Sequence, residues 1–62
     1  MKTHKITMAL ECETAGAVRY EEINEAGVPL DMHEAVIGRL YMRKHAIGVV
    51  IPREITVTVE AK

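Results

Sequence analysis

The sequence predicts an all-β fold, a small four-stranded antiparallel sheet or barrel that is completed by homo-oligomerisation. Several short runs alternate apolar with polar residues, and breaks rich in Gly, Pro and Asn separate these runs. The chain has 62 residues, and a chain of this size buries only about 60% of its unfolded surface. Residues 1–62 show no repeat or linker, so we expect one small β domain that shares apolar surface with copies of itself.

The first two strands form a predicted hairpin. Within residues 5–13, apolar side chains at positions 6, 8, 10 and 12 alternate with mostly polar ones, as in a half-buried strand. Gly16 suits a turn over residues 14–17, and residues 18–23 supply the second arm. The same alternation assigns Cys12 to the apolar row, where a thiol is a small core group and not a nucleophile.

Two further strands are expected after the hairpin. Asn24, Gly27 and Pro29 indicate a loop over residues 24–29. Residues 30–36 fit either a continuation of that loop or one short helical turn capped by Asp31. Residues 37–45 alternate again as a third strand, residues 48–52 make a second break, and residues 55–60 have the clearest strand pattern in the chain.

The third predicted strand has two chemically different faces. At period 2, Leu40 and Met42 point toward the core. The opposite row consists of Arg39, Tyr41, Arg43 and His45, with Lys44 at the strand end. Guanidinium groups bind phosphate through paired hydrogen bonds, and a phenol ring stacks on a base. The row therefore predicts a binding surface for an anion that carries a flat ring, and its alternative interpretation is an ordinary solvated strand face.

The second predicted strand contributes one residue to this surface and brings acidic neighbours. Arg19 and Tyr20 face opposite sides of the strand, so one of them at most joins the row, and we assign Arg19 to it as an assisting residue. Acidic residues occupy positions 11, 13, 21 and 22 of the hairpin. They suit cross-strand ion pairs with the arginines better than hydrogen bonds to ribose hydroxyls.

Composition argues against several classes of function. Eight Lys/Arg against nine Asp/Glu give a net charge of -1, which disfavours nucleic acid as the main partner. The single Cys12 forms no internal disulfide, and the three His residues are too scattered for a structural zinc. No catalytic motif appears, so we expect no enzyme activity, no metal and no cofactor. We also expect a cytoplasmic protein without membrane contact, because the chain has no signal-peptide pattern and no apolar run of about 20 residues.

Three segments carry a resemblance to a known family. They are residues 14–22 (TAGAVRYEE), 37–44 (IGRLYMRK) and 52–59 (PREITVTV). Together they resemble a family of very short, mostly uncharacterised β-rich proteins of bacteria and their viruses. The resemblance implies a compact all-β subunit that assembles with copies of itself and has no established enzyme activity. Small viral proteins of similar size and charge layout include sponges that sequester the cyclic nucleotide signals of bacterial antiviral defence.

The leading expectation is a non-catalytic homo-oligomer that binds a nucleotide-type anion where subunits meet. Arg39 and Arg43 hold phosphate in this hypothesis, Tyr41 stacks on the base, and Arg19 assists. Two other classes stay open. One is a small β dimer that binds DNA or single-stranded DNA, and the other is an inhibitor that adds residues 55–59 as a strand to the sheet edge of a target protein.

Overall fold

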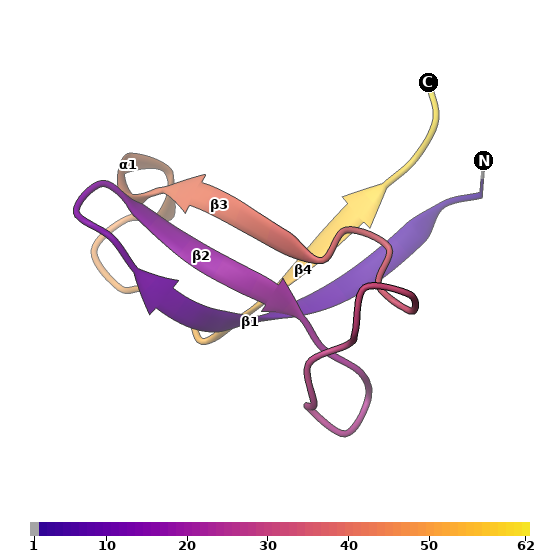
Figure 1. Ribbon diagram of the computed structural model, residues 1–62. Coiled ribbons are helices and arrows are strands. Elements are labelled where there is room, and N and C mark those ends of the chain that lie inside the picture. Colours follow the sequence, from indigo (N-terminus) through magenta and orange to yellow (C-terminus); the bar gives the residue numbers. More distant parts are fainter. Residues whose placement is uncertain (1) are drawn as a thin grey trace.

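The sheet has the predicted class and strand content. The computed structural model describes residues 2–62, which form four antiparallel strands and one short helix (Figure 1). The elements are β1 (His4–Glu13), β2 (Ala17–Glu22), β3 (Arg39–Arg43), α1 (Lys44–Ile47) and β4 (Glu54–Val59). In space the strands follow the order β3-β2-β1-β4, so β3 and β4 lie at the two edges of the sheet. The predicted all-β, four-stranded antiparallel fold is confirmed.

The long strand β1 binds a different neighbour at each of its ends. Its second half, from Met8 to Glu13, pairs with β2, and its first half, from His4 to Ala9, pairs with β4. Because strands twist, this offset curls the sheet into a half-barrel in which β4 passes behind β3 (Figure 1). The curl gives the sheet an inner, concave face and an outer, convex face.

The inner face of the half-barrel holds the core. Met8, Val18 and Tyr20 are fully buried, and the Tyr20 hydroxyl donates a 2.9 Å hydrogen bond to the carbonyl of Pro52. Half-buried apolar side chains surround this centre: Leu10, Ile37, Leu40, Met42, Ile47, Ile51, Ile55, Val57 and Val59. The two β3 residues of this set point inward, as predicted. Much of the apolar lining therefore keeps contact with solvent in a single chain.

Cys12 does not lie in the apolar row. The pairing of β1 with β2 shifts between Leu10 and Cys12, which makes Glu11 the extra residue of a β-bulge. Cys12 is consequently opposite Arg19 and shares its outer face, where the thiol is half-exposed. The expectation of a buried core thiol is wrong, because strict alternation does not anticipate an extra residue within a strand.

The third strand ends earlier than its sequence pattern indicates. Lys44 and His45 were expected to continue the strand, but they begin α1. The helical turn brings Ile47 onto the core, and Gly48, with a φ of 97°, ends the turn. Burial of the Ile47 side chain outweighs the weak strand preference of Lys44 and His45.

The segment near Asp31 forms a tight turn and no helix. The Oδ1 atom of Asp31 accepts hydrogen bonds from the backbone N–H groups of His33 at 2.9 Å and Glu34 at 3.2 Å. Residues 32–34 have turn conformation. An aspartate side chain that bonds to the backbone in this way stabilises a turn without any helix after it. The Asp31 carbonyl also accepts a 3.0 Å hydrogen bond from the N–H of Ala35, four residues further along, so the segment closes a single turn capped by Asp31, as one of the two alternatives expected, and does not extend into a helix.

Buried Glu22 fastens the segment before β3 to the sheet. Its Oε1 atom accepts hydrogen bonds from the backbone N–H groups of Val36, Ile37 and Gly38 at 2.9, 2.8 and 3.1 Å. Burial acts to raise the pKa of the Glu22 carboxyl, but these hydrogen bonds and nearby His4 outweigh burial and hold the pKa below its ordinary value. An ionised carboxylate thus sets the position at which β3 begins.

Candidate functional site

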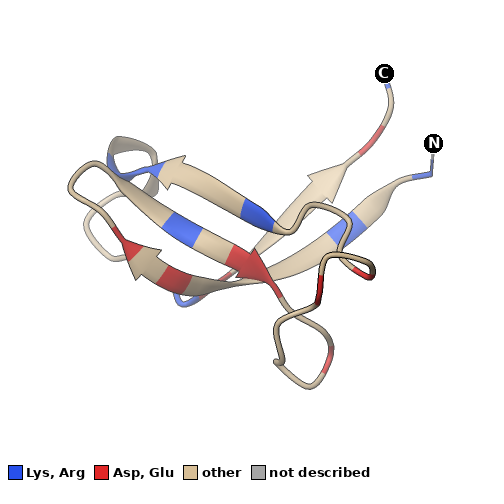
Figure 2. Ribbon diagram, in the orientation of Figure 1, with Lys and Arg blue, Asp and Glu red and all other residues tan. Residues whose placement is uncertain are grey.

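The predicted row lies on the outer face of the sheet. Arg39, Tyr41 and Arg43 alternate along β3 with inward-facing residues, and all three are exposed. On the neighbouring strand, Arg19 lies directly opposite Tyr41. Figure 2 shows these basic positions of β2 and β3 beside acidic positions of β1 and β2. The structure therefore brings four of the predicted residues onto one surface, which we call the Arg-Tyr face (Arg19, Arg39, Tyr41 and Arg43).

Arg19 fixes the position of the Tyr41 ring. Its Nη1 atom donates a 3.0 Å hydrogen bond to the Tyr41 hydroxyl, and its guanidinium carbon lies 5.8 Å from the ring centroid, within cation–π range. The Tyr41 hydroxyl and the Glu11 carboxylate raise the pKa of Arg19 above its ordinary value, so the guanidinium stays charged. Tyr41 is nevertheless 60% exposed, which leaves ring surface for a ligand.

Glu11 links two arginines of the Arg-Tyr face. Its Oε1 atom accepts hydrogen bonds from the Nε atoms of Arg19 at 2.7 Å and Arg39 at 3.2 Å. The pairing of Leu10 with Tyr20 puts the next residue, Glu11, opposite Arg19, and the β-bulge adds Cys12 to the same side. The predicted ion pairs with the arginines are thus confirmed for Glu11, whereas Glu13 pairs with Lys44 and the predicted pairing is wrong for Glu22, which binds backbone N–H groups. One carboxylate shared by two guanidiniums still leaves a net positive charge on the group.

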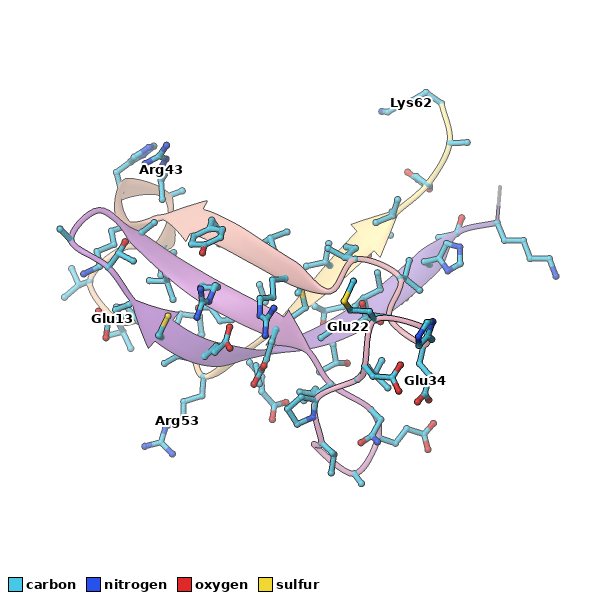
Figure 3. The ribbon with its side chains drawn as sticks, in the orientation of Figure 1. Glu13, Glu22, Glu34, Arg43, Arg53 and Lys62 are labelled. Atoms are coloured by element: carbon cyan, nitrogen blue, oxygen red, sulfur yellow. The ribbon has the colours of Figure 1, made fainter. Side chains whose placement is uncertain are left out.

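The other end of the Arg-Tyr face carries an uncompensated charge. Arg43 forms no ion pair with another residue of the described chain, 2–62, and its side chain projects at the end of β3 beside α1 (Figure 3). The Nζ atom of Lys44 is 3.2 Å from the Oε1 atom of Glu13, and His45 is an exposed residue of α1. Lys44 and His45 therefore do not continue the row.

A shallow hollow opens next to the Arg39 end of the face. It has a volume of about 500 Å³ and runs from Arg39 across Gly38 to Leu30 and Met32. The carboxylates of Glu21, Glu22 and Asp31 also line it. A second hollow of about 530 Å³ lies along the first half of β1 and the loop after β2, and its lining includes no residue of the Arg-Tyr face.

One acidic residue has a role that the sequence does not reveal. Glu22 is a buried anchor whose donors lie 14 to 16 residues further along the chain. Within residues 2–62, no group of three or more His, Cys, Asp or Glu side chains is arranged to hold a metal ion. In the same part of the chain, no helix is long and apolar enough to cross a membrane.

Comparison with known proteins does not identify a relative of this chain. No family model, curated protein or solved structure matches this chain. The family resemblance described from the three sequence segments is untested and stays a prediction. The arrangement of Arg19, Tyr41 and their neighbours on the outer face is what supports a functional assignment.

Proposed function

We propose that this protein is a non-catalytic homo-oligomer that binds, and thereby sequesters, an anionic small molecule of the nucleotide type on its Arg-Tyr face. The observation that carries the proposal is the contact between Arg19 and Tyr41. Two strands bring a guanidinium and a phenol together at 3.0 Å, and two more guanidiniums flank the phenol along β3. An aromatic ring between cations on one flat surface suits a ligand that has both phosphate and a base.

The spacing of the cations suits a ligand with two phosphate groups. Arg39 and Arg43 are four residues apart, about 13 Å along a strand, with Tyr41 between them. Arg43 has no competing carboxylate within residues 2–62. Arg39 uses its Nε atom for Glu11, so its Nη atoms remain as donors for phosphate oxygens. A base stacked on the ring would carry one phosphate toward each arginine, as in a cyclic dinucleotide.

The contacts within the face also lower the cost of binding. The Tyr41 hydroxyl is held by Arg19, and Glu11 holds both Arg19 and Arg39. Ordering long side chains on binding costs about 0.5–1.5 kcal/mol for each one. Because the protein has already ordered three of these side chains, a ligand meets a prepared surface. A ligand phosphate adds to this network at the Nη atoms and does not need to displace Glu11.

The chemistry of these groups fits binding without turnover. A guanidinium stays protonated in proteins and supplies no general base. The carboxylate of Glu11, which lies within the face, is engaged by two arginines. We therefore expect a bound phosphate ester to stay intact, and the protein to act by lowering the concentration of the free ligand. A cyclic nucleotide signal is the ligand class that this role favours.

Isothermal titration of the purified chain tests the proposal. The probes are cyclic dinucleotides and the isomers of cyclic ADP-ribose, each titrated at low and at raised salt. We expect a saturable signal with at least one probe, weaker at raised salt because charge contributes to affinity. Arg43→Gln and Tyr41→Leu should each weaken binding at least tenfold, through loss of a phosphate contact and of the stacking ring. No heat with any of these probes would overturn the proposal.

A matched control separates the Arg-Tyr face from general charge. Arg53→Gln removes the same charge as Arg43→Gln, but Arg53 projects from the connection before β4, away from Arg43 (Figure 3). We expect Arg53→Gln to bind as the unchanged protein does. If both arginine variants weaken binding equally, the ligand responds to net charge and the assignment to this face fails. Tighter binding of a single-stranded DNA oligonucleotide than of any cyclic nucleotide would favour the DNA-binding alternative instead.

The strand-addition alternative is supported by one observation. Residues 55–59 belong to β4, and β4 lies at an edge of the sheet. An edge strand is the place at which another strand adds by main-chain hydrogen bonds. A second copy of this chain is one candidate for that added strand.

A further inference from the structure

We propose that two copies of this chain assemble by pairing β3 of each copy with β4 of the other, antiparallel, so that two half-barrels close into one barrel. The inference rests on the homo-oligomer in the proposed function and identifies the surfaces that form it. It follows from three features of the single chain: the backbone groups at the two open edges, the charges beside them, and the apolar surface left uncovered.

On β4, half of the backbone groups turn away from the sheet. The N–H of Leu10 donates to the carbonyl of Arg53 at 2.8 Å, which marks these two as a hydrogen-bonded pair of the β1–β4 ladder. Antiparallel ladders alternate, so the backbone groups of Glu54, Thr56 and Thr58 point to the open edge. The strand has no proline, no bulge and no inward-pointing charge, which are the usual devices that block pairing at an edge.

On β3, the same reasoning identifies a second open row. The N–H of Glu22 donates to the Gly38 carbonyl at 2.8 Å, and the N–H of Lys44 donates to the Gly16 carbonyl at 3.1 Å. The even-numbered residues of β3 therefore face β2, and the odd-numbered ones turn their backbone groups to the open edge. These are the three outer-face residues of β3, at positions 39, 41 and 43.

Charge selects one of the three ways in which two such edges can meet. Antiparallel pairing of β3 with β3 about Tyr41 sets Arg39 of each copy beside Arg43 of the other, whereas pairing of β4 with β4 about Thr56 sets Glu54 beside Thr58 and forms no ion pair. Pairing β3 with β4 sets Arg43 beside Glu54. It also sets Tyr41 beside Thr56, and the five residues of β3 then lie entirely within the six of β4. Opposite charges across strands stabilise a pairing and like charges weaken it.

The same register matches the apolar faces. With Arg43 beside Glu54, Met42 comes beside Ile55 and Leu40 beside Val57 on the inner face. All four of these apolar side chains are only half-buried in the single chain. In both strands, the backbone groups at the open edge belong to residues whose side chains lie on the outer face. One register therefore satisfies the hydrogen bonds between the strands and also keeps the apolar side chains on the inner face.

The exposed area of the single chain exceeds that of a compact monomer by about the area that one interface would cover. It amounts to 4871 Å², whereas a compact monomer of this mass exposes about 4,000 Å². The difference is about 900 Å², close to the roughly 800 Å² that each partner buries in a stable interface. A two-fold axis generates the β3–β4 contact twice, so the ring closes and neither copy keeps an open edge.

Closure also extends the Arg-Tyr face across the subunit boundary. The outer side chains of β4 from the second copy, Thr56 above all, would lie beside Tyr41. A ligand stacked on this ring then touches both subunits. This arrangement places the proposed ligand where subunits meet.

Sedimentation equilibrium of the full chain at micromolar concentration tests the pairing. We expect a species of twice the chain mass, and a single-chain mass overturns the inference. Thr56→Pro removes an N–H that points to the open edge, a position at which an edge strand tolerates proline. It should lower the association constant at least tenfold, whereas Thr56→Ala keeps the N–H and should leave association unchanged. Equal association of the two variants, with unchanged circular dichroism, overturns the inference.

Cysteine cross-linking tests the register even if the proline variant fails to fold. In a Cys12→Ala background, Tyr41→Cys combined with Thr56→Cys should form a covalent dimer on oxidation, since paired strands hold the two Cα atoms within disulfide range. Thr56→Cys alone should stay monomeric on a denaturing gel. Rapid cross-linking of that single variant would show β4 paired with β4 and overturn the inference.

The two proposals fail in different ways. Ligand heat from a chain that sediments as a monomer overturns the barrel and leaves anion binding in place. A β3–β4 dimer that gives no heat with any probe overturns anion binding and leaves the barrel.

Discussion

The Oε1 atom of Glu22 accepts a 2.8 Å hydrogen bond from the backbone N–H of Ile37, 15 residues further along the chain. Two neighbouring N–H groups donate to the same carboxylate. Glu22 is 5% exposed, and a buried charge is stable only where hydrogen bonds replace its water. This one side chain therefore ties the long segment between β2 and β3 to the sheet and sets where the Arg-Tyr face begins.

Replacing the Glu22 carboxylate by an amide should destabilise the protein. We expect Glu22→Gln to lower the free energy of unfolding by about 2 kcal/mol. The substitution removes hydrogen bonds to a charged acceptor, and it buries an amide NH₂ group that can face the backbone N–H donors of residues 36–38. Urea unfolding followed by circular dichroism measures the change. The control is Glu25→Gln, in the exposed loop after β2, which should change stability by less than about 0.5 kcal/mol. Equal losses in the two variants would contradict the role of Glu22.

The same carboxylate predicts a loss of stability in acid. The pKa of Glu22 is lower in the folded chain than its ordinary value of 4.5. Its contribution is therefore fully present above about pH 4.5 and is lost as pH falls through the folded-state pKa. We expect the difference in unfolding free energy between the unchanged protein and Glu22→Gln to shrink between neutral pH and about pH 3. A difference that stays constant over this range would show that folding does not lower the pKa of the Glu22 carboxyl, and would contradict this prediction.

The sequence predicts a strand correctly where apolar and polar residues alternate within the strand itself. Residues 55–60 were expected as a strand, and β4 occupies Glu54–Val59. The deviations arise from contacts that alternation does not encode. The β-bulge turns Cys12 to the outer face beside Arg19, and α1 brings Ile47 onto the core. Both depend on residues far away in the sequence, so neither leaves a local signal.

The candidate site was predictable to the same degree. Period 2 correctly placed Arg39, Tyr41 and Arg43 on one face of β3, and the opposite directions of Arg19 and Tyr20 identified Arg19 as the neighbour that shares it. The sequence did not reveal that Tyr41 accepts a hydrogen bond from Arg19. That contact requires the register between β2 and β3, and register is set by the turn and by the core pattern together.

The buried hydroxyl of Tyr20 should contribute measurably to stability. It donates a 2.9 Å hydrogen bond to the carbonyl of Pro52 and joins β2 to the connection before β4. We expect Tyr20→Phe to lower the free energy of unfolding by about 1–2 kcal/mol, because the carbonyl loses its partner. Tyr41→Phe is the matched control, since its hydroxyl bond to Arg19 is exposed and should contribute about 0.5 kcal/mol or less. Thermal unfolding of both variants makes the comparison, and a larger loss for Tyr41→Phe would contradict it.

Two glycines should respond in opposite directions to the same substitution. Gly38, at the start of β3, has a φ of 89°, and a Cβ atom there would meet nothing within 4 Å. Gly38→Ala therefore costs backbone strain alone, about 1–2 kcal/mol. Gly16 has equally open surroundings and no positive φ, so Gly16→Ala should stabilise the chain by about 0.4–1 kcal/mol through a more restricted unfolded state. Urea unfolding of the two variants measures both effects: a Gly38→Ala variant as stable as the unchanged protein would contradict the backbone strain, and a destabilised Gly16→Ala variant would contradict the effect on the unfolded state.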